Sequence, residues 1–173
     1  MPRMTARLPL RYQVSETSHT VLFTEDVVKH FRRHRQRWSW CPEAGGQLFA
    51  KLSPAQVEIC KATGPYRNDT RGRYFFRPDR GKENSDIEEC FRQGLHYVGD
   101  WHTHPQKCPD PSAEDLVSIA DSFKKSTHEL LGFLLVIVGT TNPPGGLWVG
   151  WHDGKRSVQL LEDVQRGAKQ VQS

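Results

Sequence analysis

The chain reads His102-Thr103-His104-Pro105 and then Ser112-Ala113-Glu114-Asp115, with seven residues between His104 and Ser112. Successive side chains of a strand alternate between its two faces, so histidines at positions i and i+2 point to the same side. Asp115 lies eleven positions beyond His104, in the first turn of a predicted helix. Two imidazole nitrogens and one carboxylate oxygen leave a fourth position open, as in catalytic rather than structural Zn²⁺ sites. The pattern predicts a zinc hydrolase whose metal ligands are His102, His104 and Asp115.

A candidate base for this site stands upstream, in Cys41-Pro42-Glu43-Ala44-Gly45-Gly46-Gln47-Leu48-Phe49. The two glycines open an apolar-alternating run that indicates the start of a strand. A glutamate at the mouth of a strand, beside flexible backbone, can lie near a metal ion without ligating it. Zn²⁺ lowers the pKa of its bound water to about 7, so we expect Glu43 to take that proton and pass it to the leaving amine.

Glu43, His102-x-His104 and Ser112-x-x-Asp115 together resemble the JAMM (MPN+) metallopeptidases, the zinc-dependent class of deubiquitinating and related isopeptidases. His-x-His alone occurs in many hydrolase folds, but with Ser-x-x-Asp at this interval and an upstream glutamate it is specific. The resemblance extends over about residues 20 to 162, by analogy of element order. It implies the MPN fold, a single-domain α/β (α+β) architecture with a mixed β-sheet flanked by helices. It also implies that the Ser112 hydroxyl donates a hydrogen bond to the oxyanion of a tetrahedral intermediate.

The short length, the Glu-x-Gly-Gly strand opening and Gly99-Asp100-Trp101 before the histidines are similar to a compact bacterial branch of the family. That branch includes peptidases encoded with CD-NTase enzymes in CBASS antiphage operons, and proteins of integrative and conjugative elements. The resemblance implies a protein substrate whose C-terminus is joined to a lysine, with a CD-NTase as the conjugated partner. Such a substrate would lie extended beside a strand and pair with its main chain.

Two other functions stay open at this point. A JAMM peptidase can instead process a ubiquitin-like or sulfur-carrier protein precursor, in which case it would cleave linear fusions rather than lysine-linked conjugates. A non-catalytic MPN scaffold would only bind partners, although such modules typically lack the ligands that are all present here.

Length and composition favour one soluble domain, since 36% of the 173 residues are apolar and 25% are charged. The longest apolar stretch, Leu130 to Val138, is too short to span a bilayer and predicts a buried central strand. The N-terminus lacks the apolar segment of a secretory signal, so we expect a cytoplasmic location and no membrane contact. The cysteines are expected as free thiols, mostly buried, because none has Cys-x-x-Cys spacing: Cys41, Cys60, Cys90 and Cys108.

The net charge of +4 is concentrated in two basic runs, residues 30–37 and Arg67 to Arg80. Such runs are typical of a solvated helix face or of contact with an acidic partner. No nucleic-acid-binding motif accompanies them, so the sequence favours a solvated face or a protein partner over nucleic acid.

The chain is expected to divide into an extended arm (1–18), the metallopeptidase domain (19–163) and a polar tail (164–173). Predicted helices cover residues 25–37, 86–93 and the segment from Ser112 to Phe123; predicted strands cover 45–51, 56–62, 74–76, 96–102, 130–139, 146–152 and 156–162. The long, charged segment 64–86 is expected to be a loop that contacts substrate, by analogy with the variable insertions of the family.

Several of these residues have simpler explanations. Ser112 would be a helix N-cap, worth about 1 kcal/mol, and Asp115 the acidic partner of a capping box, which is compatible with ligation. Glu43 taken alone would be a surface glutamate. Cys108 would close the metal site as a fourth ligand, but this would abolish the catalytic water. The aromatic residues are expected in the core: Trp101, Trp151 and Tyr74-Phe75-Phe76.

Overall fold

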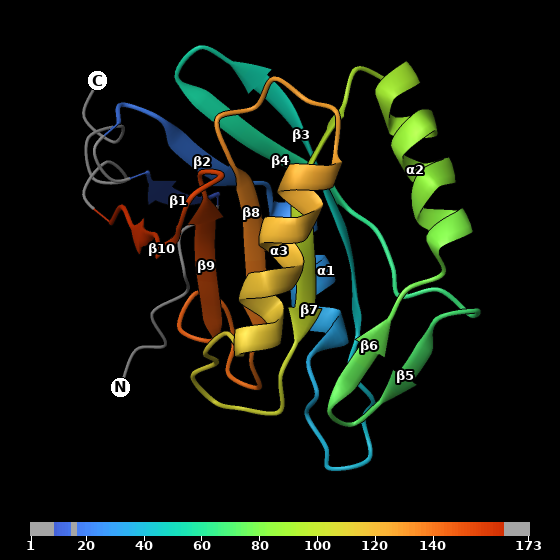
Figure 1. Ribbon diagram of the computed structural model, residues 1–173. Coiled ribbons are helices and arrows are strands. Elements are labelled where there is room, and N and C mark those ends of the chain that lie inside the picture. Colours follow the sequence, from blue (N-terminus) through green and yellow to red (C-terminus); the bar gives the residue numbers. More distant parts are fainter. Residues whose placement is uncertain (1–8, 15–16, 165–173) are drawn as a thin grey trace.

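The computed structural model describes residues 9–14 and 17–164, and this part of the chain is built on a mixed β-sheet of nine strands (Figure 1). The spatial order of the strands is β10-β9-β8-β7-β3-β4-β2-β1-β11. They are β1 (Leu10–Gln13), β2 (Thr20–Phe23), β3 (Gly45–Ser53), β4 (Gln56–Ala62), β7 (His96–Thr103), β8 (Phe133–Val138), β9 (Leu147–His152), β10 (Ser157–Gln159) and β11 (Leu161–Glu162). The pairs β2/β4 and β7/β8 are parallel and the other pairs are antiparallel. 

Three helices and a separate hairpin complete the described chain. The helices are α1 (Glu25–His34), α2 (Arg80–Arg92) and α3 (Ala113–Lys125), and the hairpin consists of β5 (Thr70–Gly72) and β6 (Phe75–Arg77). The mixed sheet with helices on both sides confirms the expected α/β (α+β) class. None of the helices in the described ranges is both long and apolar enough to cross a bilayer.

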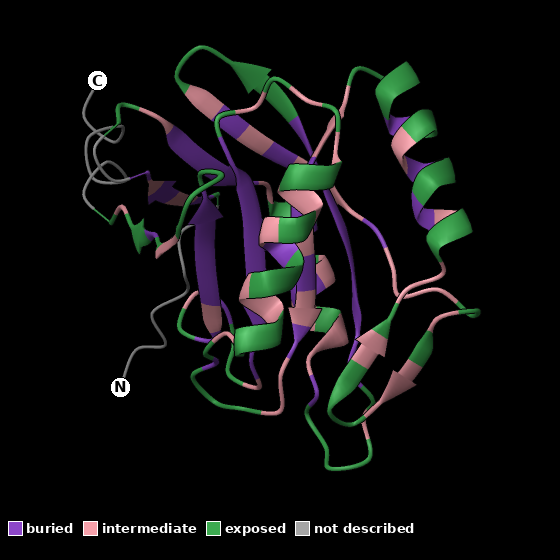
Figure 2. Cartoon of the chain, in the orientation of Figure 1, coloured by how far each residue is buried: buried purple, intermediate pink, exposed green. Residues whose placement is uncertain are grey.

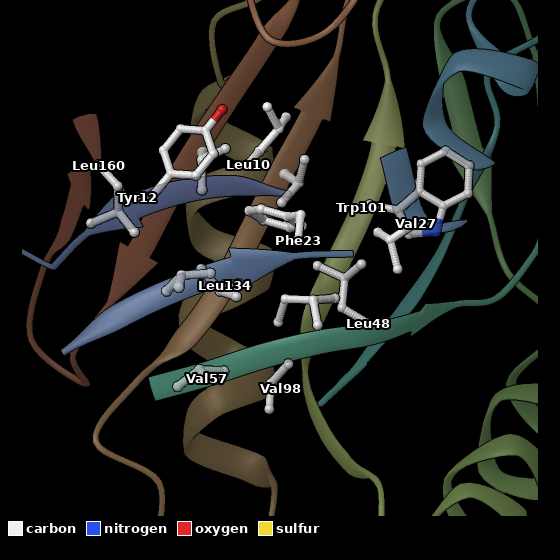
Figure 3. Close-up of a cluster of buried hydrophobic side chains, with 14 of the residues drawn as sticks. Leu10, Tyr12, Phe23, Val27, Leu48, Val57, Val98, Trp101, Leu134 and Leu160 are labelled. Atoms are coloured by element: carbon white, nitrogen blue, oxygen red, sulfur yellow. The ribbon is translucent and has the colours of Figure 1, made fainter. Parts of the chain in front are cut away.

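Strand β8 lies at the centre of the fold and is buried along its whole length, as predicted for the longest apolar stretch. Leu134 and its alternate neighbours join the core that contains Val27 of α1 (Figure 3). Phe133, Leu135 and Ile137 point the other way and pack with Ile119 of α3. Because helices cover both faces, β8 carries apolar residues continuously rather than in alternation, and the central strands are coloured as buried in Figure 2.

The segment 157–162 joins the two ends of the sheet. The sequence predicts one strand over 156–162, but β10 pairs with β9 whereas β11 pairs with β1, and only Leu160 lies between β10 and β11. The Leu160 amide donates to the Val149 carbonyl at 2.8 Å, and its side chain enters the core. The sheet therefore curls until its outer strands are linked, and the edges of β1 and β9 are covered.

Strand β7 contains a bulge that sets the direction of every side chain after it. Leu48 pairs with Gly99 and Phe49 pairs with Tyr97, so Val98 is the extra residue. Gly99 has φ +142°, and a Cβ there would lie 1.9 Å from the Leu134 carbonyl oxygen, so only glycine fits. 

Two expectations at the N-terminal side of the chain need correction. Residues 1–18 were expected to form an arm, but Leu10–Gln13 is a strand of the sheet whose Leu10 and Tyr12 are buried. Helix α1 ends at His34 rather than at residue 37, because Arg35 takes an extended conformation. The rest of the predicted arm over residues 1–8 and 15–16, and all of the predicted tail except Val164, lie outside the described residues.

The segment expected as a loop over 64–86 is largely ordered. Helix α2 starts at Arg80 rather than at residue 86, and the Asp79 side chain caps it by accepting from the amides of Gly81 (3.0 Å) and Lys82 (3.2 Å). The pattern concealed this helix because its buried face carries Glu83, Asp86 and Cys90 instead of apolar residues.

The aromatic run Tyr74-Phe75-Phe76 does not belong to the core, contrary to prediction. The Tyr74 side chain is 73% exposed and Phe75 is also exposed. These residues lie in or beside β6, which pairs only with β5 and stands outside the nine-stranded sheet (Figure 1). Trp101 and Trp151 are buried as predicted. The cysteines are free, but of the four only Cys90 is buried, so that part of the expectation is wrong.

Candidate metal centre and active site

Three side chains converge where the end of β7 meets the start of α3. The Nε2 atoms of His102 and His104 lie 3.1 Å apart. Asp115 places Oδ1 3.1 Å from Nε2 of His102 and Oδ2 3.4 Å from Nε2 of His104. Within the described ranges, these three residues form a group whose ligand atoms all lie within 4.8 Å of one another.

The spacing of these atoms fits a zinc ion. A tetrahedral Zn²⁺ with Zn–N bonds of about 2.0–2.1 Å keeps neighbouring ligand atoms about 3.3 Å apart. The three separations, 3.1, 3.1 and 3.4 Å, are close to that value. Two neutral imidazoles and one carboxylate are ligands that Zn²⁺ prefers, and three protein ligands leave a position open. The site can therefore hold a catalytic zinc ion.

The N-terminus of α3 fixes the direction of the Asp115 carboxylate. The Ser112 Oγ accepts from the Asp115 amide at 3.1 Å, and the Asp115 Oδ2 accepts from the Ser112 amide at 2.7 Å. This reciprocal pair is the predicted capping box. Because Oδ2 is held by the amide while the carboxylate faces both histidines, Asp115 serves as cap and as candidate ligand at once.

The charges at the centre favour an anionic Asp115. Burial alone would raise the pKa of the Asp115 carboxyl, but hydrogen bonds from His102 and His104 outweigh burial and hold the pKa below its ordinary value. Burial alone would lower the pKa of the His104 imidazole, but Asp115 and Glu43 raise it. A carboxylate that stays ionised beside two imidazoles attracts a cation.

Glu43 lies in the same cleft and is 6% exposed. Burial raises the pKa of its carboxyl to about 7, with the Asp115 charge acting in the same direction and His104 opposing it. The hairpin holds the backbone of this residue: the Glu43 amide donates to the Gly72 carbonyl at 2.7 Å, and the Arg71 Nε donates to the Glu43 carbonyl at 2.5 Å. A buried carboxyl with a pKa near neutrality can accept and release a proton at neutral pH.

A buried polar network that no sequence motif indicates supports the Glu43 segment from the other face of β7. The Thr103 hydroxyl accepts from the Ala44 amide at 2.9 Å and donates to the Gln36 Oε1 at 2.9 Å. The Gln36 Nε2 in turn donates to the carbonyls of Cys41 (3.1 Å) and Arg73 (2.9 Å). Strand alternation is the sequence signal for the role of Thr103, because a residue between two ligands on a strand must face away from the metal site.

The centre opens into a cleft of about 880 Å³. One wall is the β5–β6 hairpin with the segment that follows it, a second is the start of α3, and Asp100 of β7 lies in the floor beside His102. The cleft is lined in part by Glu43, His102, His104, Ser112, Asp115, Tyr74 and Phe76. All five predicted site residues therefore line one cavity. Cys108 is exposed and is not part of the three-ligand group.

The chain is similar to known proteins over most of this region. A family model described as prokaryotic homologues of the JAB domain matches residues 24–151, a range that includes Glu43, both histidines, Ser112 and Asp115. A protein of Vibrio cholerae named CD-NTase/cGAS isopeptidase is 31% identical over 140 residues, which cover 78% of this chain and 83% of that protein.

A second relative and a solved structure are also similar to this chain. A probable metalloprotease of Sinorhizobium fredii is 35% identical over 96 residues, which cover 53% of this chain and 58% of that protein. A protein of Desulfitobacterium hafniense, known from a solution structure, aligns with a TM-score of 0.57 at 16% identity, over 79% of this chain and 87% of that one. The second likeness concerns the fold alone.

Proposed function

Because this chain belongs to the family of prokaryotic JAB-domain homologues, we propose that it is a zinc-dependent isopeptidase that cleaves a protein C-terminus from a target lysine. Membership of the family confirms the JAMM/MPN relationship and single-domain fold expected from the sequence, and the chain is a hydrolase of the peptidase type. The zinc ion, the roles of individual residues and the identity of the substrate belong to the proposal.

The convergence of His102, His104 and Asp115 in the cleft that also holds Glu43 carries this proposal. When bound there, Zn²⁺ supplies Lewis-acid chemistry, since it polarises a carbonyl and lowers the pKa of water. Glu43 would accept a proton from the attacking water and deliver it to the leaving lysine amine, acting first as general base and then as general acid. Its burial and its position among these residues suit both steps.

Ser112 is proposed to stabilise the developing oxyanion. Its Oγ accepts the Asp115 amide hydrogen, so the hydroxyl hydrogen is left to point elsewhere, and the residue lines the cleft. A donor already held in place by the helix start would need no reorganisation when negative charge develops on the substrate oxygen.

The hairpin is the proposed contact for the substrate. The cleft is lined by Tyr74, Phe75 and Phe76. Exposed aromatic side chains are suited to packing against an extended peptide. The name of the Vibrio cholerae relative suggests a conjugated CD-NTase as substrate, which would make the reaction a reversal of ubiquitin-like conjugation in CBASS antiphage defence.

Zinc content tests the metal site independently of activity. Elemental analysis should find about one zinc per chain in the wild type and little in His104→Ala, because the site loses one of three protein ligands. His96→Ala is the matched control, since His96 lies on the same strand but outside the ligand group. Absence of zinc from folded wild-type protein supplied with zinc would contradict the proposal and favour a scaffold.

A cleavage assay then tests the reaction. Wild type should hydrolyse an isopeptide conjugate between a CD-NTase C-terminus and a lysine, and Glu43→Gln should lose this activity while keeping its zinc. Cleavage of linear precursor fusions but not of the lysine-linked conjugate would instead indicate precursor processing.

A further inference from the structure

A second, positively charged hollow lies on α1 and the segment after it, outside the catalytic cleft. It measures about 570 Å³ and is lined by Lys29, Arg32, Arg33, Arg35, Arg37, Trp38 and Cys41. None of these residues lines the cleft that contains the histidines. Five cationic side chains and no acidic one surround the hollow, so its field attracts anions.

Few of these five cationic side chains form an ion pair among residues 9–14 and 17–164. Lys29 pairs with Glu25 at 2.9 Å on the exposed side of α1. Arg35 donates to the Thr140 carbonyl at 2.7 Å and to the Arg32 carbonyl, which are neutral acceptors. In the described part of the chain, the buried Nε of Arg32 has no hydrogen-bond partner. A buried N–H group without an acceptor costs free energy, so the internal contacts of this chain do not fully satisfy Arg32.

The helix dipole explains only part of this arrangement. Arg32, Arg33 and His34 occupy the last turn of α1, where positive charge stabilises the helix. Arg35 and Arg37 lie beyond the helix, and the charges of Arg37 and Arg32 repel Arg35: burial first, and then these two neighbours, lower the pKa of Arg35. The guanidinium groups of Arg32, Arg35 and Arg37 are thus kept close together, although no acidic side chain is among the described residues that line the hollow.

Two exposed tryptophans lie beside each other here: Trp38 lines the hollow, and Trp40 stacks on Trp38. Trp38 is 60% exposed and Trp40 is 76% exposed. Their rings are stacked with a centroid separation of 5.6 Å and an interplanar angle of 5°. The segment that carries them is held in place, because the Gln36 amide bonds to the Cys41 carbonyl and the Cys41 amide donates to the Trp38 carbonyl at 3.1 Å. The pair is therefore an aromatic platform on a held segment, with most of its surface exposed to solvent.

From this combination we infer a binding site for nucleotide units, in which the arginines hold phosphate and the Trp38–Trp40 pair stacks on a base. Arginine forks match phosphate oxygens, and base stacking on an aromatic ring is worth about 1–3 kcal/mol per base. The basic run 30–37 carries no nucleic-acid motif in the sequence, and the aromatic platform becomes apparent only in the folded chain. The shared chemistry is phosphate plus planar base, as in a free nucleotide or a single strand.

Fluorescence anisotropy of a labelled 12-nucleotide oligodeoxythymidine, with the full-length protein at 50 mM salt, tests this inference. Trp40→Ala should weaken binding about 5- to 150-fold, the range that corresponds to the stacking energy. The double variant Arg32→Ala/Arg37→Ala should weaken binding and make the slope of log K against log salt shallower by about 1.4, or about 0.7 per lost contact. The matched control Lys51→Ala/Lys155→Ala removes the same charge from exposed positions elsewhere and should bind like wild type.

Competition with unlabelled ATP distinguishes a free nucleotide from a single strand as the ligand. If the site binds free nucleotides, ATP and unlabelled oligodeoxythymidine should displace the labelled strand at similar concentrations. Circular dichroism melting shows whether each variant is folded. Absence of binding by wild type, or equal losses in the arginine and lysine double variants, would overturn the inference. A polyglutamate peptide that binds as tightly as the oligonucleotide, with no effect of Trp40→Ala, would also overturn it and indicate an acidic protein partner. None of these measurements depends on peptidase activity.

Discussion

Replacing Thr103 by valine tests whether the residue between the two histidines holds the catalytic centre together. Thr103 is fully buried, and its hydroxyl bonds to the Ala44 amide and to the Gln36 Oε1, both at 2.9 Å. Valine has nearly the same shape but leaves both groups without a partner. Gln36 cannot compensate by rotating its amide, because its Nε2 is already held by two carbonyls. At about 1–3 kcal/mol for each unsatisfied buried group, less about 1 kcal/mol gained from a buried methyl, we expect a loss of about 3 kcal/mol, the middle of a range of about 1–5 kcal/mol.

Urea unfolding followed by circular dichroism measures this loss, and the melting temperature should fall by about 5–15 °C. Thr103→Ser is the matched control, since it keeps the hydroxyl and removes only a methyl group, at a cost of about 1 kcal/mol. The serine variant should therefore be more stable than the valine variant, although it is less well packed. Both should retain zinc, because the ligands lie on the other face of β7. A valine variant as stable as wild type or as the serine variant would refute the role of the network.

Three further outcomes are expected. Ser112→Ala should lower turnover about 10²- to 10³-fold while costing only about 1 kcal/mol of stability and retaining zinc; full turnover with a lower melting temperature would leave the serine as a cap alone. Burial first, and then the charges of His30, Arg71 and Arg33, lower the pKa of His34 to about 4, below its ordinary value of 6.5. The unfolded chain therefore binds this proton more readily than the folded chain, so the free energy of unfolding should fall as pH drops from about 6.5 to 4. Urea unfolding of wild type and His34→Gln at pH 7 and pH 5 measures this, and the variant should lose less free energy of unfolding between the two pH values. Tyr74→Ser should raise KM for an isopeptide substrate with kcat and melting temperature nearly unchanged, because this exposed ring lines the cleft; an unchanged KM would exclude Tyr74 from substrate contact.

The metal centre could be predicted from the sequence because its geometry is local. His102 and His104 are two residues apart on a strand, and Asp115 follows at the capped start of a helix. Strand alternation and capping chemistry are short-range rules, so they specify both the direction of the histidines and the position of the carboxylate. Glu43 is more distant in sequence: the strand opening at Gly45-Gly46 made it a candidate, and the resemblance to a family pattern gave that candidate its weight.

Features that depend on long-range packing could not be predicted in this way. Helix α2 buries Glu83 and Asp86, which form ion pairs with Arg80 (2.7 Å) and Lys82 (2.5 Å) and therefore leave no apolar periodicity. Tyr74 and Phe75 have the composition of a core strand, but they lie in a hairpin that is separate from the nine-stranded sheet, and both are exposed. The pairing of β1 with β11 joins strands from near the beginning and near the end of the described residues, and no local pattern in either strand specifies its partner.

The alternation of β7 explains why one strand can serve both the chemistry and the core. Beyond the bulge at Gly99, Asp100 and His102 face the cleft, while Trp101 and Thr103 face the side of α1. Trp101 packs on Phe31 and donates to the Thr63 carbonyl at 2.9 Å, so the core fixes the strand against sliding. A register shift of one residue would turn both histidines into the core and expose Trp101, at the cost of its buried surface. The free energy that stabilises the core therefore also holds the candidate ligands in position before any metal binds.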